Sequence, residues 1–227
     1  ETRLAVYPSP IENYFAPNST REVVALLNEY PGARIIAGGQ SLLPLLKSRV
    51  VSAQTLIDLN RVKGLSAIET GPNAVTFGAL VRYHDVLQNH AVASDCAALA
   101  DAIRVIGDRQ VRNRGTLVGS LAHRDHTGDI APVALIFDAT LMSLDAAGDS
   151  TIVPVETFVR EPTTNLMTAL RLHYTKCGSA FVKHTRVAQD RAMVNAAAAL
   201  EYDEHGRLLN VRVAIGGVLA APRRAFA

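Results

Sequence analysis

Two glycine-bearing stretches carry the residue types best suited to ligand chemistry in this chain. The first stretch, residues 34–44, reads RIIAGGQSLLP, so a short apolar run enters two glycines that are followed by Gln40 and the hydroxyl residue Ser41. Glycine tolerates positive φ and lets a ligand approach the backbone closely, so successive N–H groups can converge on an anion without a lysine. This composition indicates a cradle for a pyrophosphate group.

The first stretch alone is a weak signal. It matches neither G-x-G-x-x-G nor G-x-x-x-x-G-K-[ST], and two glycines after a strand are commonly just a turn. The second stretch, residues 110–125, reads QVRNRGTLVGSLAHRD and repeats the glycine and hydroxyl chemistry with charged side chains added. Two such stretches can together hold one dinucleotide.

Three segments in order resemble a known family: AGGQSLLPLLKSR, LIDLNRV and RQVRNRGTLVGSLAHRDHTGDIAPVAL. They are similar to the FAD-binding medium subunit of the molybdenum hydroxylases, the family of xanthine dehydrogenase and carbon monoxide dehydrogenase, and the similarity covers nearly the whole chain. The resemblance implies an α+β (mixed α/β) fold, with a two-subdomain FAD-binding part of the PCMH type over residues 1–177. The subdomains would span about 1–60 and 61–177, and residues 178–227 would begin a C-terminal α/β domain that is incomplete here.

The resemblance also assigns cofactor contacts to the two stretches. Backbone amides of the first would hold the FAD pyrophosphate, and the second would contribute Thr116, Gly119 and Ser120. Val118 stands where the family usually has the first of two adjacent glycines, and valine resists positive φ. The first-stretch residues are Ala37, Gly38, Gly39, Gln40, Ser41 and Leu42.

Three charged side chains complete the site that the resemblance implies. Asp125 would accept hydrogen bonds from flavin-side hydroxyls or amides, and Asp129 is a second candidate for such a role. Lys183 would lie near the isoalloxazine ring, where a cation stabilises the anionic reduced flavin. The alternative for Lys183 is a solvated surface lysine.

The implied function is electron transfer within an oxidoreductase complex. FAD would carry electrons from iron–sulfur clusters to an external acceptor, while the molybdenum cofactor and [2Fe-2S] clusters would lie in a large molybdopterin-binding subunit and a small iron–sulfur subunit. The resemblance implies a dimer of heterotrimers. Two cysteines, Cys96 and Cys177, are too few to hold a four-cysteine cluster within this sequence. The alternatives are a stand-alone FAD-dependent oxidase or reductase of the same broad fold, and a non-catalytic nucleotide-binding module.

Composition argues against other classes of function. The formal net charge is +2, and the arginines between residues 104 and 114 lack the interleaved aromatics of a nucleic-acid surface. The acidic and histidine side chains of residues 123–129 meet no zinc or di-metal spacing rule, so no metal site is expected. No apolar run reaches the roughly 20 residues of a membrane span, and no signal peptide opens the chain, so a cytoplasmic location is expected.

Alternating helices and strands are expected to position the two stretches. Residues 33–37 read as a strand leading into the first stretch, and residues 42–47 as a helical turn leaving it. One long helix over residues 94–106 is expected before the second stretch, which reads as a loop. The other expected elements are helices at 21–30 and 83–89 and strands at 56–59, 74–79, 139–145, 151–154, 180–183 and 211–215.

Overall fold

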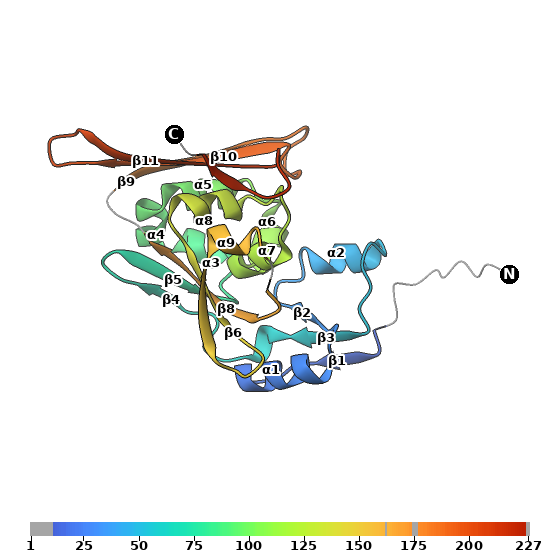
Figure 1. Ribbon diagram of the computed structural model, residues 1–227. Helices are drawn as coiled ribbons and strands as arrows, with labels where there is room; N and C mark the ends of the chain where they lie inside the picture. The colour runs from blue at the N-terminus through green and yellow to red at the C-terminus, as the bar shows by residue number, and fades with distance from the viewer. Residues whose placement is uncertain (1–10, 162, 174–176, 226–227) are drawn as a thin grey trace.

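The computed structural model describes residues 11–161, 163–173 and 177–225, and these form three β-sheets in succession along the chain (Figure 1). The first sheet is parallel, with β3 (Thr55–Asp58) between β1 (Asn13–Phe15) and β2 (Arg34–Ile36). Parallel strands need crossover connections, which α1 (Thr20–Glu29) and α2 (Leu42–Lys47) supply. The first glycine stretch therefore leaves the carboxyl end of a parallel strand, where ligands commonly bind in such sheets.

The second sheet is antiparallel and has the order β4-β5-β8-β6-β7. A group of short helices lies between it and the third sheet (Figure 1). The most buried of these, α8, is apolar on every side, as expected for a helix enclosed by other elements. The strands are β4 (Ile68–Thr70), β5 (Ala74–Gly78), β6 (Thr140–Leu144), β7 (Ser150–Pro154) and β8 (Leu166–His173); the helices are α3 (Tyr83–Gln88), α4 (His90–Asp95), α5 (Ala97–Arg104), α6 (Arg109–Arg114), α7 (Leu117–His123), α8 (Ile130–Ile136) and α9 (Val155–Phe158).

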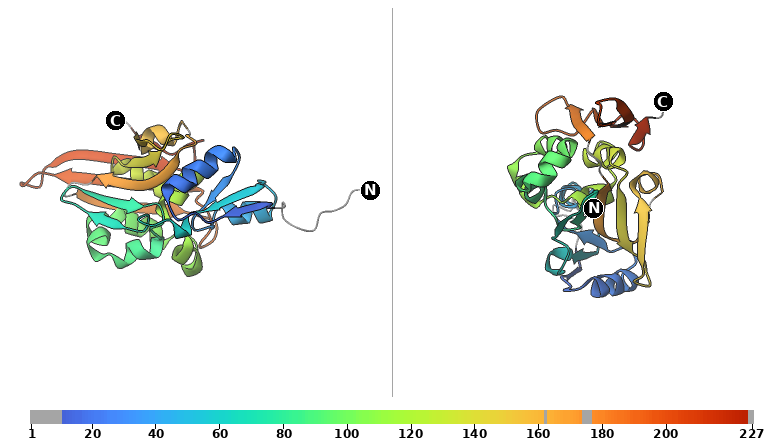
Figure 2. Two further views of the ribbon diagram at one scale, coloured as in Figure 1. Left: turned by 90° about the horizontal axis from the view of Figure 1, so that it is seen from below. Right: turned by 90° about the vertical axis from the view of Figure 1, so that its left-hand side faces the viewer.

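The third sheet is antiparallel and packs on α5 and α8. Its inner face carries the small side chains of Ala197, Ala199 and Ala214, which are almost fully buried and allow the helices to approach closely. Figure 2 shows its β10–β11 hairpin projecting beside the β4–β5 hairpin, away from the first sheet. The strands are β9 (Cys177–His184), β10 (Val194–Tyr202), β11 (Leu208–Gly216) and β12 (Arg223–Ala225), in the order β12-β11-β10-β9.

The mixed α/β class is confirmed, whereas two local expectations are wrong. The expected helix over residues 94–106 is two helices that meet at Cys96, a fully buried residue with φ of −123° and ψ of 58°. Asn89 starts the earlier helix by accepting a hydrogen bond from the Val92 amide. The second glycine stretch is not a loop, because α6 and α7 occupy most of it.

Other differences concern strands that are too short or too weakly patterned to stand out in sequence. The structure adds β1, β4, β8, β10 and β12 to the expected strands and lengthens β9 beyond residues 180–183. β8 lies in the middle of its sheet, and its first half, Leu166 to Ala169, does not alternate between buried and exposed positions. The division into domains at residue 177 stays a prediction, although the sheet changes between β8 and β9.

Candidate functional site

The first glycine loop, Ala37 to Ser41, joins β2 to α2 and presents unbonded backbone amides. Within the described part of the chain, none of the N–H groups from Gly38 to Leu42 donates a hydrogen bond to another residue. Gly39 has a φ of 75°, a conformation that residues with a Cβ rarely adopt. The Gln40 side chain donates to the Gly38 carbonyl at 3.2 Å, which occupies an acceptor and leaves the amides available. A run of available amides around a positive-φ glycine is the kind of backbone from which anion-binding sites are built.

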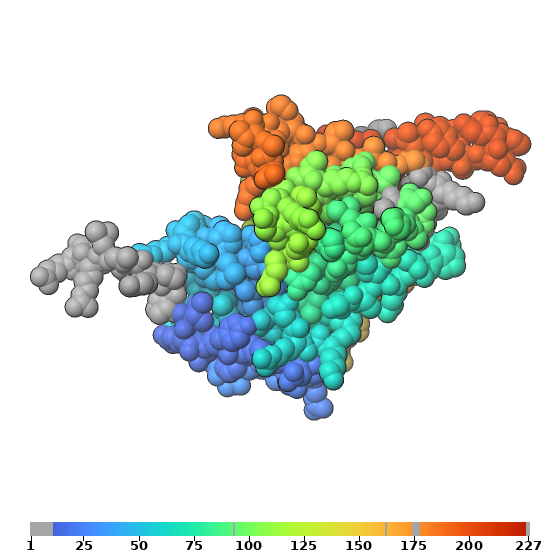
Figure 3. Space-filling model, turned by 180° about the vertical axis from the view of Figure 1, so that it is seen from behind, coloured from blue at the N-terminus to red at the C-terminus, as the bar shows by residue number. Residues whose placement is uncertain are grey.

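The two glycine stretches, residues 34–44 and 110–125, meet in space although they are far apart in sequence. A Cβ on Gly38 would lie 2.1 Å from the Arg114 carbonyl oxygen and 2.9 Å from the Gly115 Cα. No other residue type therefore fits at Gly38 without moving one of the two backbones. Figure 3 shows the surface from behind, with the segment around α2 in light blue and the third sheet in orange on either side of the green helices.

The second glycine segment, Gly115 to Ser120, is the start of a well-capped helix. The Thr116 hydroxyl accepts from the Gly119 amide at 3.1 Å, and the Thr116 carbonyl accepts from the Ser120 amide at 3.1 Å. Val118 lies inside α7 and is 2% exposed, so its replacement of a glycine requires no positive φ. Most amides at this end of α7 already have protein partners.

Sequence reasoning missed the side chains that tie the two segments together. Arg82, which precedes α3, donates through Nη1 to the carbonyls of Asn113 and Arg114, both at 3.2 Å. Its Nη2 donates to Asn60 Oδ1 at 3.2 Å, and Asn60 Nδ2 in turn donates to the Ala37 carbonyl at 2.9 Å. Asn60 falls within LIDLNRV, one of the segments that carry the family resemblance, whereas nothing around Arg82 in the sequence signals its role.

Asp58 begins the turn that carries Asn60, and hydrogen bonds stabilise its charged form. Burial alone would raise the pKa of Asp58, but hydrogen bonds from Tyr14 and Asn60, together with the charge of Arg114, hold that pKa below its usual value. Asp58 Oδ1 accepts from the Asn60 amide at 2.9 Å. The ionised carboxylate therefore fixes the position of Asn60 beside the first glycine loop.

Tyr83 packs against the second glycine segment. Its ring packs against Gly115, and its hydroxyl shares a hydrogen bond with Ser120. Burial raises the pKa of Tyr83 to about 12, against the lowering effect of the Ser120 hydrogen bond. The phenol is therefore neutral at physiological pH and serves as a hydroxyl partner beside a predicted cofactor residue.

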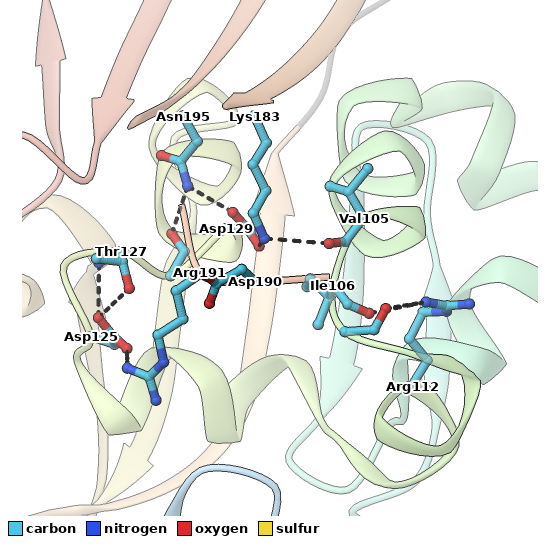
Figure 4. A network of polar contacts seen from close by, with 12 residues as sticks. Val105, Ile106, Arg112, Asp125, Thr127, Asp129, Lys183, Asp190, Arg191 and Asn195 are labelled. Atoms are coloured by element: carbon cyan, nitrogen blue, oxygen red, sulfur yellow. Dashed lines mark hydrogen bonds and ion pairs between the residues drawn. The ribbon is translucent and has the colours of Figure 1, made fainter. Parts of the chain in front are cut away.

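Asp125 is held by protein partners on both of its oxygens (Figure 4). Oδ1 accepts from the Thr127 amide at 2.9 Å and from the Thr127 hydroxyl at 2.6 Å, while Oδ2 pairs with Arg191. The Arg191 side chain is 60% exposed and extends from the connection between β9 and β10. Asp125 and Ser120 also line a small pocket with Arg124 and the loop at residues 220–222.

Lys183 is buried rather than solvated, which excludes the surface-lysine alternative. Figure 4 shows its side chain pointing to Asp129, with an Nζ to Oδ2 distance of 2.8 Å and only 5% and 7% of the two side chains exposed. Nζ also donates to the Val105 carbonyl at 3.3 Å, and Asn195 Nδ2 donates to Asp129 Oδ1 at 2.8 Å. Burial raises the pKa of Asp129, partly offset by Lys183 and Asn195. The contacts link the third sheet to the ends of α5 and α8.

Two of the arginines between residues 104 and 114 have partners within the protein. Arg112 donates to the Ile106 and Gly107 carbonyls at 3.0 and 2.9 Å, and Arg104 pairs with Asp101 at 3.0 Å.

Among the described residues, no group of three or more histidine, cysteine, aspartate or glutamate side chains could hold a metal ion. None of the helices in the described ranges has the length and apolar character needed to cross a membrane.

Comparison with known proteins places these features in one family. Residues 9–172 match the family described as the FAD binding domain in molybdopterin dehydrogenase. The chain is 34% identical over 227 aligned residues to the glyceraldehyde dehydrogenase medium chain of Sulfolobus acidocaldarius, which covers 97% of this chain and 80% of that protein. It is 33% identical over 220 residues to the nicotine 6-hydroxylase medium subunit of Paenarthrobacter nicotinovorans, with coverage of 95% and 77%.

Solved structures agree with the sequence comparison. Carbon monoxide dehydrogenase from Hydrogenophaga pseudoflava superposes with a TM-score of 0.89 at 30% identity, covering 96% of this chain and 78% of that one. Quinoline 2-oxidoreductase from Pseudomonas putida 86 gives a TM-score of 0.87 at 32% identity, with coverage of 96% and 77%. With its motifs in order and its fold shared, the chain belongs to the FAD-binding domain family of the molybdopterin dehydrogenases.

Proposed function

We propose that this chain is the FAD-binding medium subunit of a multi-subunit molybdenum hydroxylase and passes electrons from iron–sulfur clusters to an external acceptor. The observation that carries the proposal is the junction of the two glycine segments, where Gly38 lies directly against the Arg114 and Gly115 backbone. Segments far apart in sequence are held in contact, and one of them offers a run of unbonded amides. A dinucleotide is the ligand that needs such an arrangement.

The residues present fit FAD. The amides of Gly38 to Leu42 would hold the pyrophosphate, because none of them has another acceptor among the described residues. Gly39 permits the turn that aims them. Ser120, already paired with the neutral Tyr83, would offer a hydroxyl to the ribityl side. When bound, FAD supplies the redox chemistry, and the protein supplies orientation and electrostatics.

We further propose that Asp125 and Lys183 shape the flavin end of the site through their ion pairs. Asp125 holds the Arg191 guanidinium in place, and the Lys183–Asp129 pair fixes the third sheet against α5 and α8. Each pair is neutral overall, so neither brings a large net charge to the cofactor. The role of Lys183 would be a local field from an oriented pair rather than a free cation.

The proposed partners are a large molybdopterin-binding subunit and a small iron–sulfur subunit, assembled as a dimer of heterotrimers. Support comes from relatives whose names describe a medium chain, a medium subunit or a subunit of a complex. The two cysteines of this sequence could not ligate a four-cysteine cluster. The organic substrate would bind the partner, so this chain would contact electron donors and acceptors alone.

Co-purification tests the proposal. Expressed with the products of its neighbouring genes, the chain should elute with molybdenum, iron and FAD, and substrate should bleach the flavin absorbance. Purified alone, it should bind FAD and oxidise no organic substrate. A metal-free chain that turns over an organic substrate by itself would instead establish the stand-alone flavoenzyme. A chain that binds no FAD in either preparation would contradict both.

A further inference from the structure

A single guanidinium connects the supports of both glycine segments. Arg82 Nη1 donates to the Asn113 and Arg114 carbonyls, and Nη2 donates to Asn60, all at 3.2 Å. Asn60 extends the connection to the Ala37 carbonyl at 2.9 Å, which is where the first glycine loop begins. The planar fork of arginine suits such a set of acceptors, because its donors point in fixed directions.

The backbone around Arg82 is also paired with the second glycine segment. Arg82 forms an isolated antiparallel bridge with Thr116, the Tyr83 amide donates to the Gly115 carbonyl at 3.0 Å, and the Leu117 amide donates to the Val81 carbonyl at 3.4 Å. The main chain of Arg82 is thus fixed to one segment while its side chain reaches toward the other.

The carbonyl that Arg82 holds is the one closest to Gly38. The Arg114 carbonyl oxygen would be 2.1 Å from a Cβ on Gly38, so any shift of this carbonyl moves the backbone that the first loop contacts. Asn60 is fixed on its other side by the ionised Asp58. The two ends of the connection therefore lie at the ends of regular elements, β3 and α6.

We propose that Arg82 is a positioning residue for the cofactor: through Asn60 and the Arg114 carbonyl it holds the two glycine segments at the spacing that a pyrophosphate requires. The inference rests on the proposed function. It assigns to Arg82 no contact with the ligand, and the effect of its charge is secondary to the direction of its hydrogen bonds. Its removal widens or loosens the junction while the amides of the first loop remain.

Substitutions that separate charge from hydrogen-bond geometry test the inference. FAD and ADP, which share the pyrophosphate, are titrated into the apoprotein of each variant, and thermal unfolding of the apoprotein is followed in parallel. Arg82→Met should weaken both ligands roughly 30-fold, the scale of losing one or two hydrogen bonds to a charged group. Arg82→Lys keeps the charge but carries its donors on one nitrogen and lacks the planar fork that serves acceptors on both sides, so it should remain roughly 10-fold weaker than wild type.

Two further variants complete the test. Asn60→Ala should weaken FAD to a similar extent, and the double variant with Arg82→Met should be no weaker than the stronger single effect, because both act through one connection. Arg207→Met removes a guanidinium that is 78% exposed and paired with Asp203, and it should leave FAD affinity unchanged.

Distinct outcomes separate this inference from the proposed function. Wild-type protein that binds neither FAD nor ADP would refute the proposed function itself. Wild-type protein that binds FAD, with Arg82→Met within threefold of it, would overturn the role of Arg82 alone. Full recovery in Arg82→Lys, or strictly additive losses in the double variant, would also overturn it. If Arg82→Met does not fold, the lysine variant and Asn60→Ala decide the question.

Discussion

The two glycine segments look alike in sequence and differ in structure. The first is an open loop whose amides from Gly38 to Leu42 have no partner among the described residues, while the second is the capped beginning of α7. Gly39 is required for its backbone conformation, with φ of 75°. Gly119 is required for proximity, because a Cβ there would lie 2.6 Å from the Thr116 hydroxyl. The same residue type thus permits an open loop with unbonded amides in one segment and helix capping in the other.

The difference in amide hydrogen bonding suggests different roles: the first loop would bind an anion, and the second segment would stabilise the fold around it. Unbonded amides favour an anion, whereas amides that already donate to Thr116 contribute little to a new ligand. We therefore expect changes in the first loop to act mainly on FAD affinity. Changes to the Thr116 cap of the second segment should act mainly on stability.

The largest effect is expected from a substitution that disrupts the first loop. Gly39→Val places a β-branched residue at positive φ, with its Cβ 2.9 Å from Leu43 Cδ1, and redirects the amides. The loss should be about 4 kcal/mol of FAD binding, from strain together with lost hydrogen bonds to a charged group. The purified variant should contain no FAD by absorbance.

Gly148 offers a matched control for this substitution. It also has positive φ, 87°, but lies in the turn between β6 and β7, where no atom of the described residues is within 4 Å of an added Cβ. Gly148→Val should lower the thermal midpoint through backbone strain and retain full FAD content. Loss of FAD in both variants to the same degree would show that strain, and not the position of the loop, is responsible.

The next largest effect is expected from breaking the buried ion pair between Lys183 and Asp129. Lys183→Met leaves the Asp129 carboxylate, 7% exposed, without its cation, which should cost about 3 kcal/mol of unfolding free energy. Asp129→Asn added to Lys183→Met should recover much of this loss, because the uncompensated charge is removed. Chemical denaturation at neutral pH measures both. An unchanged midpoint in the single variant would mean that the pair contributes nothing to stability.

The pH dependence of the Lys183→Met variant has a definite sign. Burial raises the pKa of Asp129 above its unfolded value, so stability falls as pH rises from the unfolded pKa through the folded one. Loss of Lys183 moves the folded pKa further upward and extends that range. The deficit relative to wild type should therefore shrink as pH is lowered and Asp129 becomes protonated. A deficit independent of pH would point to lost packing instead.

The smallest effect sharpens the comparison between the two hydroxyl residues. Thr116→Val removes the side-chain cap of α7 and should lower stability by about 1 kcal/mol. Ser41, at the start of α2, makes no side-chain cap, so Ser41→Ala should leave the stability of the apoprotein unchanged and weaken FAD. Denaturation curves and FAD titrations on both variants test the contrast. Equal stability losses would contradict the distinction between the segments.

Sequence predicted the elements around the first loop well. The apolar run 33–37, the glycines and the helical turn at 42–47 are local signals, and β2 and α2 appear within one residue of those bounds. The prediction of a loop for residues 110–125 is wrong, because the glycines and charged residues there weaken the helical pattern of the two short helices α6 and α7. Asp108 caps α6 and Thr116 caps α7, and these caps are the signals that would have identified them.

The contacts between distant segments were beyond sequence reasoning. Nothing local indicates that Arg82 reaches Asn60, or that Lys183 meets Asp129 across 54 residues. Lys183 was expected near the flavin as a cation, and its burial in a pair depends on how the third sheet packs on α5 and α8. The position of Asp125, Lys183 and the other predicted residues relative to bound FAD stays a prediction.

Hydrogen exchange of the backbone amides on addition of FAD tests the central claim most directly, because it reads the two segments separately in one experiment. We predict strong new protection for residues 39–42, whose amides have no partner among the described residues, and little change for residues 119–121, whose amides lie in the capped start of α7. Protection confined to 119–121, with residues 39–42 exchanging as fast as before, would contradict it.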